Sequence, residues 1–135
     1  MQLHLMDFVE SRLLGVQVDE TGREVELSFV GTDKAKFVLE LHGVERLLIN
    51  EFRQQNVVEE VVHWTRAAAS EDLREAAFFL MTGSSEKDCQ PQLAAVAQAV
   101  VDRVIRGELE VIGVSAVFGA QVLASFESMT IRKGT

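Results

Sequence analysis

EVELSFVGTDKAKFVLELH, residues 24–42, decides the fold of this chain, because apolar and polar residues alternate through both of its halves. A period of two is typical of antiparallel strands that have one face in a core and the other in water. The glycine-bearing segment 31–34 separates the halves, which predicts two adjacent strands joined by a turn. The predicted inward residues are Val25, Leu27, Phe29, Phe37, Leu39 and Leu41, and the outward residues are Glu24, Glu26, Ser28, Lys36, Val38, Glu40 and His42.

Further strands are predicted on both sides of this pair. Leu14, Val16 and Val18 alternate with glycine and polar residues and lead into another turn, which predicts a hairpin with the strand that follows. Residues 44–56 are predicted to form a strand and then a loop. Residues 57–64 contain four valines, and β-branched side chains lose rotamer freedom on a helix, so we predict a strand there.

Two helices are predicted in the middle of the chain. Residues 71–82 follow Ser70, a typical N-cap, and precede Gly83, a typical C-terminal residue. Residues 91–106 begin with the only proline, where its missing N–H costs nothing. The apolar residues of the second helix recur at intervals of three and four, which is typical of one buried face. They are Leu93, Val96, Ala97, Val100, Val101 and Val104.

The end of the chain returns to strands. One run begins at Leu109, and a second run after Gly113 alternates as far as Phe126. The apolar parity then changes, which predicts a bulge or a strand end near residues 127–128. The predicted inward residues of the second run are Phe118, Ala120, Val122, Ala124 and Phe126.

These elements predict one α+β domain over residues 1–135. We expect a mostly antiparallel sheet of five to seven strands, formed by both ends of the chain, with the two central helices packed on one face. The hydrophobic content of 47% supplies enough apolar side chains for a real core.

Composition also bears on the cellular context. No run approaches the ~20 apolar residues that cross a bilayer, and the first residues lack the basic region of a signal peptide. A single cysteine, Cys89, cannot form an internal disulfide, which suits a reducing compartment. We therefore expect a cytoplasmic protein that does not associate with membranes.

The net charge of −8 is concentrated in the first half of the chain. Residues 1–64 carry 12 acidic against 6 basic residues, whereas residues 65–135 carry 9 against 7. An acidic surface repels phosphate backbones, so a basic protein is the expected partner and nucleic acid is not. The same charge can also serve solubility alone. The candidate partner-binding residues are Asp19, Glu20, Glu24, Glu26, Glu40 and His42.

No arrangement typical of an enzyme is found in the sequence. The histidines His4, His42 and His63 show none of the spacings of zinc or acid–base sites. The segment 113–119 lacks the spacing of a nucleophile elbow, and no phosphate-binding loop occurs. We predict no catalytic, cofactor-binding or metal-binding residues, and a protein that acts by binding another protein.

Two alternatives stay open. A small-molecule-binding domain or an enzyme would need a pocket between sheet and helices, with Glu40, His42 or His63 as its polar groups. A structural homodimer would use apolar surface at the end of the first helix or on the alanine-rich flank of the second. An enclosed pocket lined by convergent polar side chains would favour the first alternative, and a doubled mass would favour the second.

Two stretches resemble small bacterial proteins of uncertain function that include toxin-immunity domains. The first, residues 11–56, contains SRLLGVQVDETG, VELSF, FVLELHGVERL and NEFRQQN, and the second, residues 109–131, is LEVIGVSAVFGAQVLASFESMTI. The resemblance implies a protein that binds another protein without cofactor or catalysis. Immunity proteins commonly use acidic surfaces to neutralise cationic toxins, and no residue role transfers from them to this chain.

Overall fold

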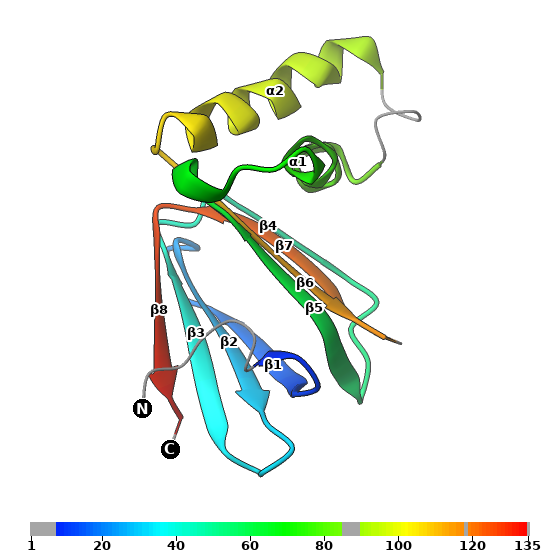
Figure 1. Cartoon of the computed structure of the whole chain (residues 1–135), viewed down its shortest axis with the longest axis vertical. Coiled ribbons are helices and arrows are strands. Elements are labelled where there is room, and N and C mark those ends of the chain that lie inside the picture. Colours follow the sequence, from blue (N-terminus) through cyan, green and yellow to red (C-terminus); the bar gives the residue numbers. More distant parts are fainter. Residues whose placement is uncertain (1–7, 85–89, 118, 135) are drawn as a thin grey trace.

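The computed structural model describes residues 8–84, 90–117 and 119–134. The predictions for His4, Cys89 and Phe118 concern residues outside these ranges. One antiparallel sheet and two helices make up the fold (Figure 1). The strands are β1 Arg12–Val18, β2 Glu24–Val30, β3 Lys36–His42, β4 Arg46–Asn50, β5 Asn56–Trp64, β6 Glu110–Ala116, β7 Gln121–Phe126 and β8 Ser128–Lys133; the helices are α1 Asp72–Thr82, α2 Pro91–Ile105 and the short 3-10 helix η2 Arg66–Ala68.

The sheet has eight strands, so the prediction of five to seven was wrong, whereas the α+β class with two helices is confirmed. β6 continues through Gly113, because β5 and β7 pair with it on both sides of that glycine. The chain turns between β6 and β7. β7 then ends at Phe126, next to Glu127, where the sequence predicted a bulge or a strand end. The closing segment therefore forms three strands.

The sheet consists of two halves that face each other (Figure 1). Its strand order is β4-β7-β6-β5-β1-β2-β3-β8. We call β1, β2, β3 and β8 the first half-sheet, and β4 to β7 the second. Between β1 and β5 the halves are joined by two residue pairs, Arg12 with Val57 and Leu13 with Asn56. So short a connection lets one twisted sheet fold over and enclose its inner face.

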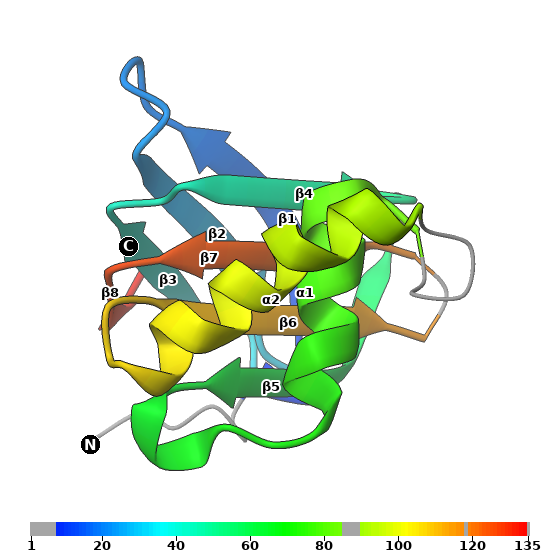
Figure 2. The same cartoon turned by 90° about the horizontal axis from the view of Figure 1, so that it is seen from above.

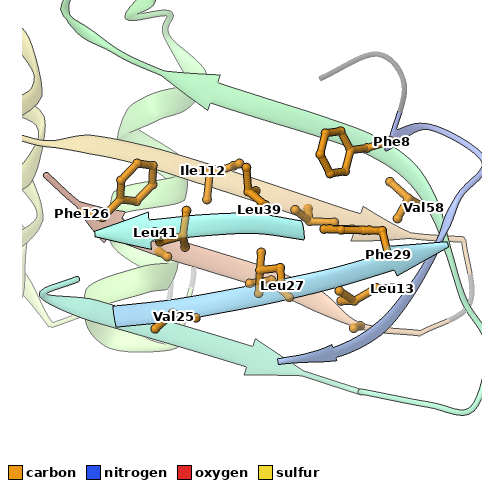
Figure 3. Packing of buried hydrophobic residues seen from close by; sticks show 14 of the residues in the cluster. Phe8, Leu13, Val25, Leu27, Phe29, Leu39, Leu41, Val58, Ile112 and Phe126 are labelled. Carbon is orange, nitrogen blue, oxygen red and sulfur yellow. The ribbon is translucent and has the colours of Figure 1, made fainter. Parts of the chain in front are cut away.

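The main hydrophobic core fills the space between the half-sheets (Figure 3). All six residues predicted to point inward from 24–42 are buried there, and each contributes about 1.5–3 kcal/mol when fully buried. Phe8 joins this core from outside the sheet. Its ring centroid lies 4.7 Å from that of Phe29 and 4.6 Å from that of Phe37, in edge-to-face contact.

Both helices lie on the outer side of the second half-sheet, which gives the molecule three layers (Figure 2). Gly83, at φ 74°, ends α1, and its N–H donates to the Phe79 carbonyl, as its position in the sequence predicted. Ser70 does not cap the helix. The helix begins at Asp72, and the Ser70 hydroxyl donates to the carboxylate of that residue instead of to a backbone group.

α2 buries only part of its predicted face. Ala97, Val100 and Val104 are buried, whereas Leu93 is 37% and Val96 is 42% exposed. The reason is that α2 packs mainly against α1 and η2 and does not lie along the sheet. The intervals of three and four between apolar residues therefore located the helix correctly. They predicted a wider buried face than the structure has.

β1 contains a bulge that the sequence did not predict. The register with β2 shifts between Leu13 and Gly15, so Leu13 enters the core and Leu14 is 46% exposed. One extra residue in a strand moves all side chains that precede it to the opposite face of the sheet. Val16 packs partly against the core, and Val18 is exposed near the end of the hairpin. Val16 pairs with the inward residue Leu27 and Val18 with the inward residue Val25, so the predicted alternation of Leu14, Val16 and Val18 was wrong only at Leu14.

Candidate functional site

The outer side of the first half-sheet brings together four of the six predicted partner-binding residues. Glu24 lies opposite His42, and Glu26 lies opposite Glu40. The Nδ1 of His42 lies 2.7 Å from the Glu24 carboxylate, and its Nε2 lies 3.1 Å from the Thr130 hydroxyl. Because a carboxylate only accepts hydrogen bonds, Nδ1 carries a proton. Both ring nitrogens of His42 therefore have partners within the chain.

Arg132 of β8 balances part of this negative charge. Its guanidinium lies 3.2 Å from the Glu26 carboxylate and 3.0 Å from the Glu40 carboxylate. Two carboxylates opposite each other on a sheet repel, and a cation between them removes the repulsion. One cation therefore compensates part of the negative charge of Glu26 and Glu40. We call Glu24, Glu26, Glu40, His42 and Arg132 the strand face.

Asp19 and Glu20 lie in the β1–β2 turn, apart from the strand face. The Thr21 hydroxyl donates to the Asp19 carboxylate over 2.7 Å, and the Glu24 N–H donates to it over 3.2 Å. The bond from Thr21 is the main cause that lowers the pKa of Asp19. Asp19 thus stabilises the turn, and Glu20 is exposed beside it.

His63 is paired with a carboxylate of the neighbouring strand. Its Nε2 lies 2.6 Å from Oε1 of Glu110, and its ring stacks on Phe126 with the centroids 6.1 Å apart. The sequence had offered Glu40, His42 and His63 as polar groups of a pocket between sheet and helices. A hollow does exist there, but none of these three residues lines it.

This hollow, which we call the groove, has a volume of about 170 Å³ and lies between α1 and the second half-sheet. Residues of β5, β6 and β7 form one side, and residues of α1 form the other. Its lining contains three carboxylates and no basic side chain from the part of the chain that the structure describes. The lining residues are Glu60, Val62, Trp64, Asp72, Glu75, Ala76, Phe79, Gly113, Ser115, Gln121 and Leu123.

Two neighbouring rows across the second half-sheet give the groove an apolar part and a polar part. Strand pairing aligns Glu60 with Ser115, and Ser115 with Gln121. Side chains two positions apart share a face, so the adjacent row faces the helices as well. That row is apolar and consists of Val62, Gly113 and Leu123.

Trp64 holds one of the three carboxylates in place. Its indole N–H donates to Oδ1 of Asp72 over 3.0 Å and to the Ser70 hydroxyl over 3.1 Å. The hydrogen bond from Ser70, followed by that from Trp64, lowers the pKa of Asp72. Asp72 is therefore a fixed, ionised group at neutral pH.

Glu60 and Glu75 are exposed and have no ion-pair partner among residues 8–84, 90–117 and 119–134. They differ in this respect from Glu26 and Glu40, which share Arg132. The sequence did not predict a site at Glu60, Asp72 and Glu75, because the first lies on β5 and the other two lie on α1. The sequence alone does not show that these two elements meet.

Two larger open hollows occur elsewhere on the molecule. One of about 510 Å³ is lined by Arg53, Gln54, Gln55, Val57 and Val117. The other, of about 560 Å³, lies beside the β2–β3 turn and includes Lys36, Lys133 and Asp33 in its lining. Neither has a histidine or two carboxylates among its described lining residues, so neither offers a general acid–base pair.

Within the described ranges, no group of three His, Cys, Asp or Glu side chains is placed to hold a metal ion. No described helix is both long and apolar enough to span a bilayer. Comparison of the chain with protein-family models, with characterised proteins and with solved structures finds no match.

Proposed function

We propose that this chain is a non-catalytic protein-binding protein that captures a basic partner, in the manner of toxin-immunity proteins. The observation that carries the proposal is the uncompensated negative charge of Glu60 and Glu75 beside the fixed carboxylate of Asp72. Uncompensated carboxylates attract a cationic surface over long range and set the orientation in which it docks. The strand face offers less negative charge to a cationic partner, because Arg132 already neutralises part of that charge.

The chemistry of the groove supports binding in preference to catalysis. General acid–base catalysis is most effective with a group whose pKa lies near the working pH. The pKa of Asp72 is lowered instead, which keeps this carboxylate an acceptor. Its hydrogen bonds from Trp64 and Ser70 fix its position without supplying a proton-transfer partner.

The test is complex formation between the full chain and a basic protein encoded by a neighbouring gene. Purified proteins are mixed and their dissociation constant is measured at low and at physiological salt. We expect tight binding that weakens as salt rises. If the neighbouring gene encodes no basic protein, or the two proteins fail to associate, the immunity-like function is rejected.

The location of the binding surface is tested with two double variants that remove equal charge. Glu60→Gln with Glu75→Gln alters the groove, and Glu26→Gln with Glu40→Gln alters the strand face. We expect the groove variant to weaken the complex by about tenfold, or about 1.4 kcal/mol, and the strand-face variant to weaken it less. Equal losses in both would reject the groove as the preferred surface.

A further inference from the structure

We infer that the groove receives a single arginine side chain of the basic partner. This inference rests on the proposed function and names the chemical group that the groove selects. A suitable occupant has an apolar stem to cover the floor and a cationic head to meet the carboxylates. Arginine and lysine both satisfy this description, and the groove distinguishes between them.

The size of the groove limits its occupant to one side chain. Pockets that bind drug-sized molecules have volumes of roughly 300–1,000 Å³, whereas the groove has about 170 Å³. A hollow of this size suits one long side chain and is too small for a folded peptide segment.

The floor of the groove suits the stem and the flat face of a guanidinium. Gly113 lets the side chains of Trp64 and Leu123 pack closely at the floor, because a Cβ there would lie 3.3 Å from Cζ3 of Trp64 and 3.2 Å from Cδ2 of Leu123. Phe79 and Trp64 are the two aromatic lining residues of the hollow; Trp64 is 5% exposed, and Phe79 is the more exposed of the two. Guanidinium groups stack on aromatic faces, whereas an ammonium is a compact, strongly hydrated point charge.

The rim of the groove suits the hydrogen-bond donors of a guanidinium. Asp72 is fixed by the indole of Trp64, and Glu60 and Glu75 approach from a strand and a helix on either side. A guanidinium carries five N–H donors in a fixed plane, and a lysine ammonium carries three. Three carboxylates, one on β5 and two on α1, therefore match arginine better than lysine.

A peptide titration tests this inference. The acetylated and amidated tripeptide Gly-Arg-Gly is added to the full chain, and the fluorescence and indole N–H resonance of Trp64, the only tryptophan, are recorded. We expect a saturable change at Trp64. Affinity should fall by about tenfold in the Glu60→Gln, Glu75→Gln variant and stay within twofold in the Glu26→Gln, Glu40→Gln variant, which has the same net charge.

Three outcomes would overturn the inference: no saturable change at Trp64, the same affinity in both double variants, or equal affinity for Gly-Lys-Gly. Failure of the arginine site and failure of the proposed function are distinguishable. A basic protein that binds the groove variant as tightly as the natural chain rejects the arginine site alone. Absence of any complex with a basic protein rejects the function, even where the tripeptide binds.

Discussion

At the residue scale, Asn56 connects three parts of the chain and is 1% exposed. Its Nδ2 donates to the carbonyls of Leu13, over 3.2 Å, and Arg53, over 2.6 Å. Its Oδ1 accepts from the N–H groups of Arg53, over 2.8 Å, and Ala120, over 3.0 Å. All four hydrogen-bonding positions of the amide are filled. The side chain thereby holds the β4–β5 loop, β1 and the β6–β7 turn together.

Replacing Asn56 by alanine is expected to lower the free energy of unfolding by about 2–4 kcal/mol, because several backbone groups lose their partners in a dry site. Urea denaturation measures this change. The exposed Asn50 provides a control, and its replacement by alanine should change stability by less than about 0.5 kcal/mol. Equal effects at both positions would show that the Asn56 hydrogen bonds do not stabilise the fold.

The lowered pKa of Asp72 predicts that the contribution of this residue to the stability of the fold depends on pH. Its folded-state pKa is lowered from the ordinary value of 3.8, so its contribution to stability is complete above that value and is lost as the pH falls through the folded-state pKa. The stability difference between the natural chain and Asp72→Asn should therefore be present near pH 7 and shrink below about pH 4. Urea unfolding followed by Trp64 fluorescence measures it, and a difference that grows on acidification would contradict the assignment.

At the scale of elements, the connections between the half-sheets are short and closely bonded. Gly43, at φ 67°, lies between β3 and β4, and the next residue, Val44, donates its N–H to the Arg23 carbonyl over 2.8 Å. Glu127 lies between β7 and β8 and donates its N–H to the His42 carbonyl over 2.9 Å. These connections place β4 and β8 at opposite ends of one folded sheet.

The turn before β1 contributes to the main core through Phe8, which is fully buried against Phe29 and Phe37. We expect Phe8→Ala to cost about 3–5 kcal/mol, the range for removing a buried aromatic ring. Phe52, at 46% exposed, is the matched control and should change stability far less. Thermal and urea unfolding compare the two, and a Phe8 variant as stable as the Phe52 variant would show that the turn is not part of the cooperative fold.

At the scale of the whole molecule, acidic groups fall into compensated and uncompensated sets. Arg132, Arg103 and Arg23 pair with carboxylates on several elements. Glu60 and Glu75 have no such partner within the described ranges. The net charge of −8 therefore produces self-repulsion that is strongest where carboxylates lack cations.

Salt should relieve this repulsion. Raising ionic strength from about 0.01 M to about 0.15 M shortens the screening length from about 30 Å to about 8 Å, and we expect the melting temperature to rise by about 2–4 °C. The groove variant should show a smaller rise, because it lacks two unpaired carboxylates. The strand-face variant should melt lower at low salt, since it loses pairs with Arg132. Calorimetry distinguishes these responses, and identical curves for the two variants would contradict them.

The sequence determined the features that depend on neighbours along the chain. The alternation in 24–42 predicted every inward residue of β2 and β3, and the intervals of three and four located α2, because backbone geometry fixes both periods locally. The valines of 57–64 likewise predicted β5 correctly, because β-branched side chains favour the extended backbone. The predicted acidic residues of β2 and β3 also share one face, since they have the same parity.

Only the tertiary structure decided which distant residues meet. Arg132 reaches Glu26 across 106 positions of the chain, so the compensation of the strand face was hidden from any local pattern. The same holds for the groove, whose carboxylates lie on β5 and α1, and for Phe8, which no strand period included. Pairing of β8 with β3 produced the first feature, packing of α1 on the second half-sheet produced the second, and folding of the sheet over itself produced the third. The free energy of this tertiary packing comes from burying apolar surface between segments far apart in the sequence. No local pattern of residues reveals that contribution.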